Sequence, residues 1–422
     1  MPIFDQGYQH WQGPLSGHTW RWLAIARHGV RVQMKGRILR FLLLIAWLPA
    51  VGLIAAVAMW GLLEQGSESI IALVGSILPP DVLLDPRAFR VTAWTLAYSA
   101  FFKTEMYFIM LLVVVAGPGL ISRDLRFNAL PLYFARPMTR LDYFLGKLGV
   151  IAALVGAVAI GPAVFAYLVG VCFSLDLTVV RDTYTVLLAS VAYGLVITLS
   201  IGMLMLAFSS LTRRSLYVGI TWAGMWIISG TVGPMMTGFH RESTRRGAAE
   251  DSVTQWVAEN PPPPGVEMRG TYPITRWDPD KRKSFLVGVQ PGQEKEGERW
   301  QQAWSAAFQQ SWNDAENGQG DVARRDWRPL FSYVANLERI ADALLDTDSA
   351  WVAVGKAADK PRSMFGPMFG ARAKAPPVNE RRLANQMVPQ YPWEWSAGVL
   401  AVLLGLSTWT LSRRVKSLDR LK

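Results

Sequence analysis

Few residues in this sequence have the types and spacing that enzyme chemistry requires. It contains neither H-E-x-x-H nor G-x-S-x-G, and its histidines lack metal-ligand spacing. The four are His10, His18, His28 and His240. No Walker A sequence is present, because Gly146-Lys147 and Gly355-Lys356 lack both the upstream glycine and the following Ser or Thr. Since Cys172 is the single cysteine, an intrachain disulfide is excluded. We expect no resident cofactor and no ATP hydrolysis by this chain alone.

One charged and aromatic segment has a composition suited to gripping a partner. Residues 117–147 read GPGLISRDLRFNALPLYFARPMTRLDYFLGK. Arginine offers forked hydrogen bonds to carboxylates, and Asp124 is expected near the start of a short helix, where a carboxylate favours the positive end of the dipole. The alternative is a basic loop without a partner. The candidate contact residues are Arg123, Asp124, Leu125, Arg126, Phe127, Leu130, Arg136, Pro137 and Arg140.

The elements around this segment are long and apolar. The sequence is 51% hydrophobic and only 18% charged, and uncharged runs cover residues 41–63, 106–122, 148–175, 183–212, 215–239 and 395–412. About 20 helical residues cross the hydrocarbon core of a bilayer, and helices buried in soluble proteins rarely run so long without a charge. We therefore predict an all-α polytopic membrane protein with six transmembrane helices. Because the first run begins only at residue 41, it is too late and too long for a secretory signal.

The charges predict the topology. The net charge is +11, yet residues 237–394 hold 21 Lys and Arg against 21 Asp and Glu, so the whole excess lies in the membrane part and its short loops. Basic clusters fall at residues 21–40, 123–147, 213–214 and 413–422. All four lie on one side of a six-span protein, which the positive-inside rule places in the cytoplasm. We expect cytoplasmic termini and no nucleic-acid partner, because no soluble region carries a basic face.

The chain divides into four expected regions. Residues 1–40 form a cytoplasmic segment, 41–239 hold five spans with the cytoplasmic segment 121–147, 240–392 form an extracytoplasmic α+β insertion, and 393–422 hold the sixth span and a basic tail. In the first region apolar and basic residues alternate as in an amphipathic helix at the lipid headgroups. The expected membrane-elbow residues are Arg21, Arg27, Arg31 and Lys35. A simple positive-inside anchor is an equal alternative.

Four further positions within the spans are candidates for helix kinks or for the lining of a pathway. They are Gly161, Pro162, Gly233 and Pro234, since proline removes a backbone donor and neighbouring helices must satisfy the freed groups. Small residues around Gly149 and Gly156 favour close packing of the third span. Lys103 and Glu105 interrupt the second span, and we expect them near its outer end, where lysine can reach the headgroups.

The insertion has two predicted helices, at residues 295–315 and 330–345, and strand candidates near 271–275 and 284–289. The first helix presents an aromatic face every fourth residue, formed by Trp300, Trp304, Phe308 and Trp312. We interpret this face as domain core, with anchoring at the outer membrane surface as the alternative. The two helices are expected to pack on each other or on that surface.

Residues 117–147 resemble the permease subunits of ABC-2 type transporters. Those subunits commonly carry I-x-x-E-R-x-x-G-x-L-x-L-L-x-x-P-x-S-R-x-E-Y-x-x-G-K after the second span. Ten positions fit: Ile121, Asp124, Leu130, Leu132, Pro137, Arg140, Asp142, Tyr143, Gly146 and Lys147. A second resemblance is Ser209-Ser210-Leu211 after the fourth span. The departures are Asp124 for Glu, Leu125 for Arg, Asn128 for Gly and Thr139 for Ser.

The resemblance implies a dimer of six-helix permeases bound to two copies of a separate ATP-binding subunit, which holds ATP and Mg²⁺. It also implies that the segment after the second span is a coupling helix, and that the protein exports or extracts an amphiphile across a bacterial inner membrane. Two other hypotheses remain open: a membrane-anchored enzyme with its active site in residues 240–392, and a scaffold that binds a periplasmic partner there.

Overall fold

The computed structural model describes residues 20–75, 78–134, 139–174, 176–278, 283–359 and 391–415. This part of the chain contains six helical segments long and apolar enough to cross a membrane, the number of spans that the sequence predicts. They are Arg37–Glu64, Arg90–Arg126, Arg140–Phe173, Thr178–Leu211, Ser215–Glu259 and Trp393–Arg414, numbered here as spans 1 to 6. A helix satisfies all its backbone groups internally, so long apolar runs adopt it in preference to strands.

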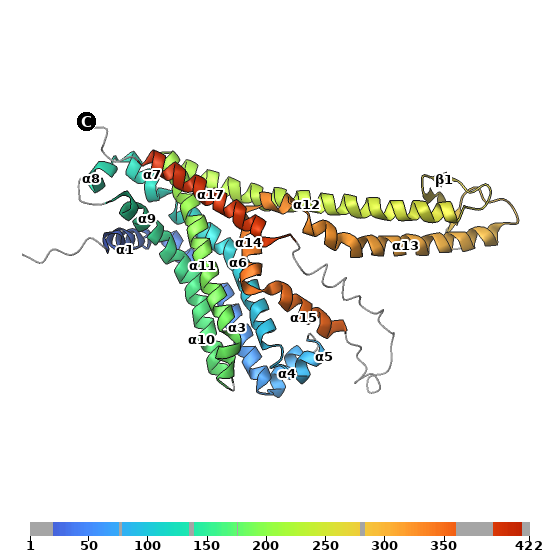
Figure 1. Ribbon diagram of the computed structural model, residues 1–422, viewed down its shortest axis with the longest axis horizontal. Helices are drawn as coiled ribbons and strands as arrows, with labels where there is room; N and C mark the ends of the chain where they lie inside the picture. Colours follow the sequence, from blue (N-terminus) through green and yellow to red (C-terminus); the bar gives the residue numbers. More distant parts are fainter. Residues whose placement is uncertain are drawn as a thin grey trace, which may run out of the picture.

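Spans 1 to 4 run side by side and form the first arm of the molecule (Figure 1). Each of the first three is assembled from shorter pieces. The elements in chain order are α2 (Arg37–Ala46), α3 (Leu48–Glu64), α4 (Glu68–Val74), α5 (Pro80–Leu84), α6 (Arg90–Ala116), α7 (Gly119–Arg126), α8 (Leu130–Phe134), α9 (Arg140–Val155), the π-helix η2 (Gly156–Ile160), α10 (Gly161–Phe173) and α11 (Thr178–Leu211). In front of them, α1 (Arg21–Gln33) packs along α9.

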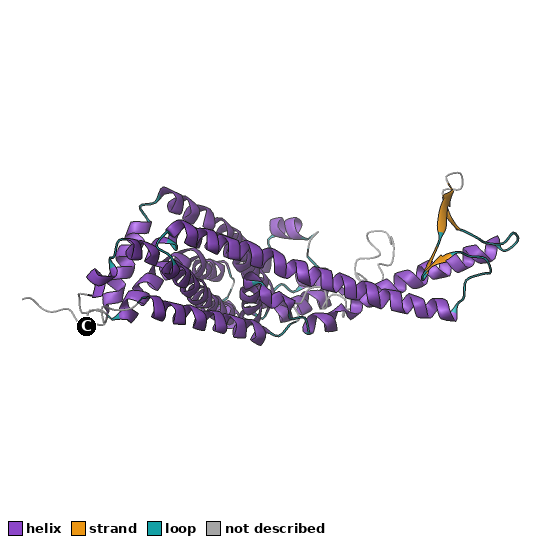
Figure 2. Cartoon of the chain, turned by 90° about the horizontal axis from the view of Figure 1, so that it is seen from above, coloured by secondary structure: helices purple, strands orange, loops and turns teal. Residues whose placement is uncertain are grey.

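Span 5 leaves the bundle as one continuous helix and forms the second arm. Helix α12 (Ser215–Glu259) has 45 residues, a length of about 68 Å at 1.5 Å per residue. It has no break at residue 240, where the sequence suggested the insertion begins. Helix α13 (Glu294–Arg324) returns along it, and two small hairpins close the tip: β1 (Met268–Arg269) with β2 (Tyr272–Pro273), and β3 (Thr275–Asp278) with β4 (Lys283–Leu286). Figure 2 shows that the helical hairpin formed by α12 and α13 projects far from the bundle.

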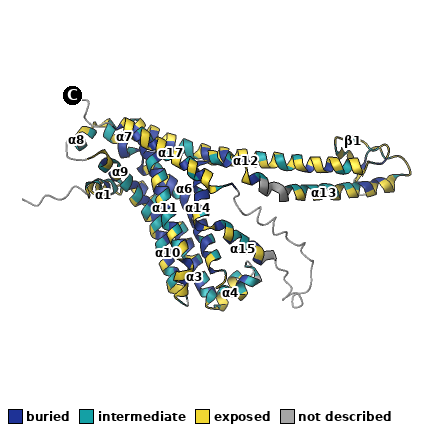
Figure 3. Ribbon diagram, in the orientation of Figure 1, coloured by how far each residue is buried: buried dark blue, intermediate teal, exposed yellow. Residues whose placement is uncertain are grey.

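The two arms meet around a helix that the sequence suggested lies in the outer domain. After the 3₁₀ turn η3 (Arg328–Phe331), α14 (Tyr333–Leu345) packs against α6, α11, α12 and α17 (Trp393–Arg414). Helix α13 packs against α12 instead, so the expectation that the two insertion helices pack on each other is wrong, whereas packing on the outer membrane surface stays a prediction. Helix α15 (Thr347–Asp359) then lies along α6. Buried residues are dense where α6, α11 and α14 meet, whereas the α12–α13 hairpin is largely exposed (Figure 3).

The third span is interrupted where its proline suggested. Pro162 has no N–H, so the carbonyl of Val158 lacks its usual i+4 donor, and the chain passes through the π-helical turn η2 just before it. The amide of Gly161 donates to the carbonyl of Gly156 across this turn. In span 5, α12 continues through Pro234, and a Cβ on Gly233 would lie 2.7 Å from the Cβ of Ser332, at the start of α14.

Candidate functional site

The basic end of the molecule, defined as α1, α7, α8 and the turn between α11 and α12, carries the predicted contact residues from Arg123 to Leu130. There, α7 is fixed at its start by Ser209 of α11. The buried Ser209 hydroxyl accepts hydrogen bonds from the amides of Ile121 and Ser122, both at 3.0 Å, and donates to the carbonyl of Pro118 at 2.8 Å. These bonds satisfy first-turn amides that would otherwise have no partner. The short helix is therefore fastened directly to span 4.

Asp124 fastens the other end of α7 to span 3. Its Oδ2 accepts a hydrogen bond from the Tyr143 hydroxyl at 2.7 Å and lies 2.7 Å from Nζ of Lys147. Both charged side chains are mostly buried, at 15% exposed for Asp124 and 12% for Lys147. The ammonium also lies 5.7 Å from the ring centre of Tyr133 and 5.4 Å from that of Tyr143. Asp124 is thus a bracing residue inside the chain.

The predicted dipole role of Asp124 is wrong. Helix α7 begins at Gly119, so Asp124 lies in its second half, where the dipole disfavours a carboxylate. The charge is balanced by Lys147 instead. Carboxylate capping occurs in α9, where Thr139 and Asp142 form a capping box that starts the helix holding Tyr143 and Lys147.

The outward face of this assembly is basic and aromatic. Arg123, Arg126 and Phe127 are exposed, Phe127 by 73%, and the guanidinium of Arg126 lies 5.5 Å from the Phe127 ring centre. Leu125 and Leu130 turn inward and pack against the core, which corrects their expected place on the contact face. Arg140 is exposed at the start of α9. Arg136 and Pro137 lie outside the described residues.

Asn128, just after α7, adopts a left-handed backbone with φ of 50°. This conformation is easy for glycine and tolerated by asparagine. The amide of Ala129 then donates to the carbonyl of Asp124, which closes the end of the helix. The departure Asn128 for Gly therefore preserves the turn.

Helix α1 is seated on α9 through glycines. A Cβ on Gly146 would lie 2.6 Å from that of Ile25, and one on Gly149 would lie 2.8 Å from that of Ala26, so only glycine permits this approach. Of the expected elbow residues, Arg27, Arg31 and Lys35 are exposed and Arg21 is half-buried. The predicted close packing at Gly149 is confirmed, whereas a Cβ on Gly156 would meet no described neighbour within 4 Å.

The aromatic face of α13 packs inside the α12–α13 hairpin. The indole of Trp300 donates to the carbonyl of Asn260 and that of Trp304 to the carbonyl of Thr271, each at 3.0 Å. Phe308 stacks between Trp304 and Trp312, at 5.4 and 6.0 Å between ring centres. The guanidinium of Arg245 lies 4.4 Å from the Trp312 ring centre. These contacts agree with the interpretation of the face as core.

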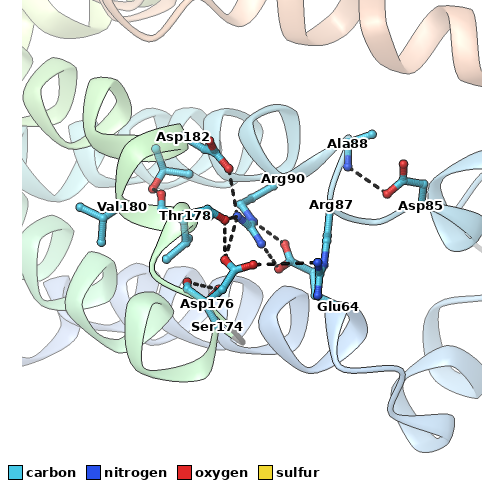
Figure 4. A network of polar contacts seen from close by, with 12 residues as sticks. Glu64, Asp85, Arg87, Ala88, Arg90, Ser174, Asp176, Thr178, Val180 and Asp182 are labelled. Atoms are coloured by element: carbon cyan, nitrogen blue, oxygen red, sulfur yellow. Dashed lines mark hydrogen bonds and ion pairs between the residues drawn. The ribbon is translucent and has the colours of Figure 1, made fainter.

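The sequence did not predict a buried ionic cluster that lies at the end of the first arm opposite α7 (Figure 4). Arg90, 2% exposed, grips Glu64 with two hydrogen bonds, Nε to Oε1 at 2.8 Å and Nη2 to Oε2 at 2.6 Å. Its Nη1 donates to Asp182 at 3.0 Å and to Thr178 at 3.2 Å. One guanidinium therefore joins spans 1, 2 and 4. The only sequence signal was that each charge borders an apolar run.

Asp176, in the turn before α11, belongs to the exposed side of this cluster. The hydrogen bond from Thr178 holds the pKa of Asp176 below its usual range, and the charges of Arg90 and Arg87 act in the same direction. The carboxylate therefore stays ionised, and attracted to Arg90, into more acidic solution than a free aspartate would.

Lys103 and Glu105 lie near the middle of α6, not near its outer end as expected, because α6 begins at Arg90. Lys103 makes an ion pair with Asp342 of α14 at 3.2 Å. Glu105 is fully buried. No group of three or more His, Cys, Asp or Glu placed to hold a metal occurs among the described residues.

No family model, curated protein or solved structure matches this chain.

Proposed function

We propose that this chain is the transmembrane permease subunit of an ABC-2 type transporter, acting with a separate ATP-binding subunit. The observation that carries the proposal is the bracing of α7. A short helix that presents Arg123, Arg126 and Phe127 outward is tied to span 4 by Ser209 and to span 3 by Asp124. A push on such a helix is delivered to two spans at once.

The residues that carry the family resemblance also carry this bracing. Asp124 meets Tyr143 and Lys147, and Gly146 admits α1 against α9. The pattern thus has a structural role in this chain, which supports the proposal. Asp124 in place of glutamate still reaches both of its partners.

The proposed assembly contains two permease copies and two ATP-binding subunits in a bacterial inner membrane. ATP and Mg²⁺ belong to the partner, which docks on the basic end through carboxylates that face Arg123 and Arg126. The substrate is an amphiphile, consistent with spans lined by apolar side chains. The elbow residues Arg21, Arg27, Arg31 and Lys35 face lipid headgroups, and the kink positions Gly161, Pro162, Gly233 and Pro234 allow the spans to bend.

Partner binding should depend on the exposed arginines. We expect Arg123→Glu with Arg126→Glu to weaken binding of the cognate ATP-binding subunit by at least tenfold, about 1.4 kcal/mol, since charge-assisted contacts become repulsive. Candidate ABC ATP-binding subunits would be co-expressed, and the affinity of the purified pair measured. Arg269→Glu, on exposed β1, is the matched control. A doubly reversed variant that binds its ATPase normally would contradict the proposal.

The proposed topology places the basic end in the cytoplasm and the α12–α13 hairpin outside. In a Cys172→Ser background, a membrane-impermeant maleimide should label Trp277→Cys in spheroplasts, because Trp277 is 61% exposed on β3. Phe127→Cys should react only after the membrane is permeabilised. Labelling of both positions from one side would overturn this topology, whatever the partner.

A further inference from the structure

Glu105 is a carboxyl group buried in the middle of α6. The residue is 0% exposed, and neither carboxylate oxygen has a hydrogen-bond partner among the residues that the structure describes. The side chains one turn before and after it on the same side of the helix, Phe101, Phe102 and Ile109, are all buried and apolar. An ionisable group in such a place needs an explanation, since ionisable residues at membrane depth are costly and are commonly functional.

The face and level of Glu105 follow from a neighbouring contact. The Tyr98 hydroxyl donates to the carbonyl of Ala163 at 2.8 Å, which fastens α6 to span 3. Glu105 is seven residues further along α6, almost two full turns, so it lies on the same face as Tyr98. The two spans run in opposite directions, and seven residues back from Ala163 is Gly156. Glu105 therefore faces span 3 at about the level of the π-helical turn η2, which contacts α6.

One backbone carbonyl at this level lacks its regular i+4 donor. Pro162 offers no N–H to the carbonyl of Val158, and a π-helical turn departs from the regular i to i+4 pairing. A protonated carboxyl can donate to such a carbonyl, whereas a carboxylate cannot.

The charged groups nearest to Glu105 in sequence, and two on the helices packed against α6, pair with residues other than Glu105. Lys103 lies on another side of α6 and pairs with Asp342 of α14. Glu338 of α14 lies close to both of these residues. Lys147 of α9 pairs with Asp124, and Glu64 of α3 pairs with Arg90. Tyr193 of α11 packs its ring against Phe102. The remaining described titratable groups on these elements are Arg37, Arg40, Arg140, Asp142, Tyr143, Arg181, Asp182, Tyr184, Tyr333, Arg339, Asp348, Lys356 and, on α12, Tyr217 and the ionisable residues from His240 onward. No ion pair joins Glu105 to any described residue.

We propose that Glu105 is a proton-binding site between spans 2 and 3, loaded in the conformation described here. An isolated carboxylate inside a protein is so unfavourable that the group takes up a proton instead. A proton is also the one cation that requires no cavity, which suits a residue with no exposed surface. Release breaks the O–H bond of Glu105, passes the proton to water and leaves a carboxylate, and it requires spans 2 and 3 to part. This site does not depend on the proposed transport function.

The test uses the purified full-length protein in lipid nanodiscs and infrared spectroscopy. The protonated-carboxyl band that wild type shows and Glu105→Gln lacks should persist between pH 6 and 8, with Glu68→Gln, at an exposed carboxyl, as control. Transfer into D₂O should shift the band slowly in wild type. Tyr98→Phe, which removes the bond to Ala163, should speed the shift about fivefold, the factor for one net hydrogen bond of about 1 kcal/mol.

Tyr167→Phe is the matched control for this exchange, because the hydrogen bonds of the Tyr167 hydroxyl join it to Val180 and Thr183 of span 4, and the substitution keeps the ring that packs on Trp94. A wild-type spectrum without the Glu105 band, or one in which the band titrates with the buffer, would overturn the proton site. Exchange in Tyr98→Phe that matches wild type would overturn the claim that the contact between spans 2 and 3 controls release. If Tyr98→Phe fails to fold, the exchange rate in wild type still decides, since a rate equal to that of an exposed carboxyl contradicts the proposal.

Discussion

Arg90→Met is expected to lower the free energy of unfolding by about 3–5 kcal/mol, the largest effect of any single substitution we consider. The guanidinium is 2% exposed and the Glu64 side chain it grips is also 2% exposed. Without Arg90, Glu64 is left as a buried carboxylate with no opposite charge. The same change releases Asp182 and Thr178 of α11, so spans 1, 2 and 4 lose their common attachment. Unfolding of the purified protein by SDS in mixed micelles, followed by circular dichroism, would measure the loss.

Two variants test the explanation. Arg90→Met with Glu64→Gln should recover most of the lost stability, because it removes the stranded charge, and Asp182 remains solvated with its side chain 42% exposed. Arg87→Met should change stability by less than about 1 kcal/mol, since Arg87 is 56% exposed and lies 3.9 Å from Asp176. Equal effects of Arg87→Met and Arg90→Met would show that burial of the Arg90–Glu64 pair is not what stabilises this end.

The number and nature of the spans could be predicted because they depend on length and apolarity alone. An uncharged run such as residues 183–212 has few alternatives to a helix, and α11 covers all of it except Thr212. The pairing of charges at the ends of the spans could not be predicted in this way. Glu64 and Arg90 are 26 residues apart and their other partners lie 88 and 92 residues from Arg90, so no local period brings them together.

The placement of α14 shows a second limit. Its apolar stripe, with Leu337 and Ala341 buried, correctly predicted a helix with one face in contact with protein. An apolar stripe does not identify its packing partner. The apolar faces of α11 and α17, on which α14 packs, could not be distinguished in the sequence from those of an outer domain. Polar contacts decide the matter in the structure: the Tyr333 hydroxyl bonds to Ser200 at 2.8 Å, and the Tyr333 amide bonds to Ser229 at 2.9 Å.

In the segment after the second span, too, some features could be predicted from the sequence and others could not. Its composition predicted the exposed arginines and Phe127, because charge and aromaticity are local properties. The role of Asp124 could not be assigned for two reasons. Whether the helix dipole favours or disfavours its carboxylate depends on where α7 begins, and its partners, Tyr143 and Lys147, lie 19 and 23 positions later in the sequence. The glycine at position 146 has a similar non-local cause, because the space beside it is occupied by α1, which precedes it by two spans.

Asp124→Asn is expected to lower the free energy of unfolding by about 2–3 kcal/mol and to weaken binding of the ATP-binding subunit at least tenfold. Asparagine leaves Lys147 as a mostly buried ammonium without its counter-charge, so the second half of α7 separates from α9. Asp124→Glu, which restores the residue usual in the family, should stay within about 1 kcal/mol of wild type.

Asp124→Asn with Lys147→Met should recover stability by removing both charges, but it should not recover affinity for the ATP-binding subunit, because α7 is still not fastened to α9. In contrast, Arg123→Glu with Arg126→Glu should lose affinity at full stability. If Asp124→Asn kept its stability and lost only its affinity, Asp124 would contact the partner directly and the bracing role would be wrong. Calorimetric unfolding and binding measurements on these variants separate the two roles.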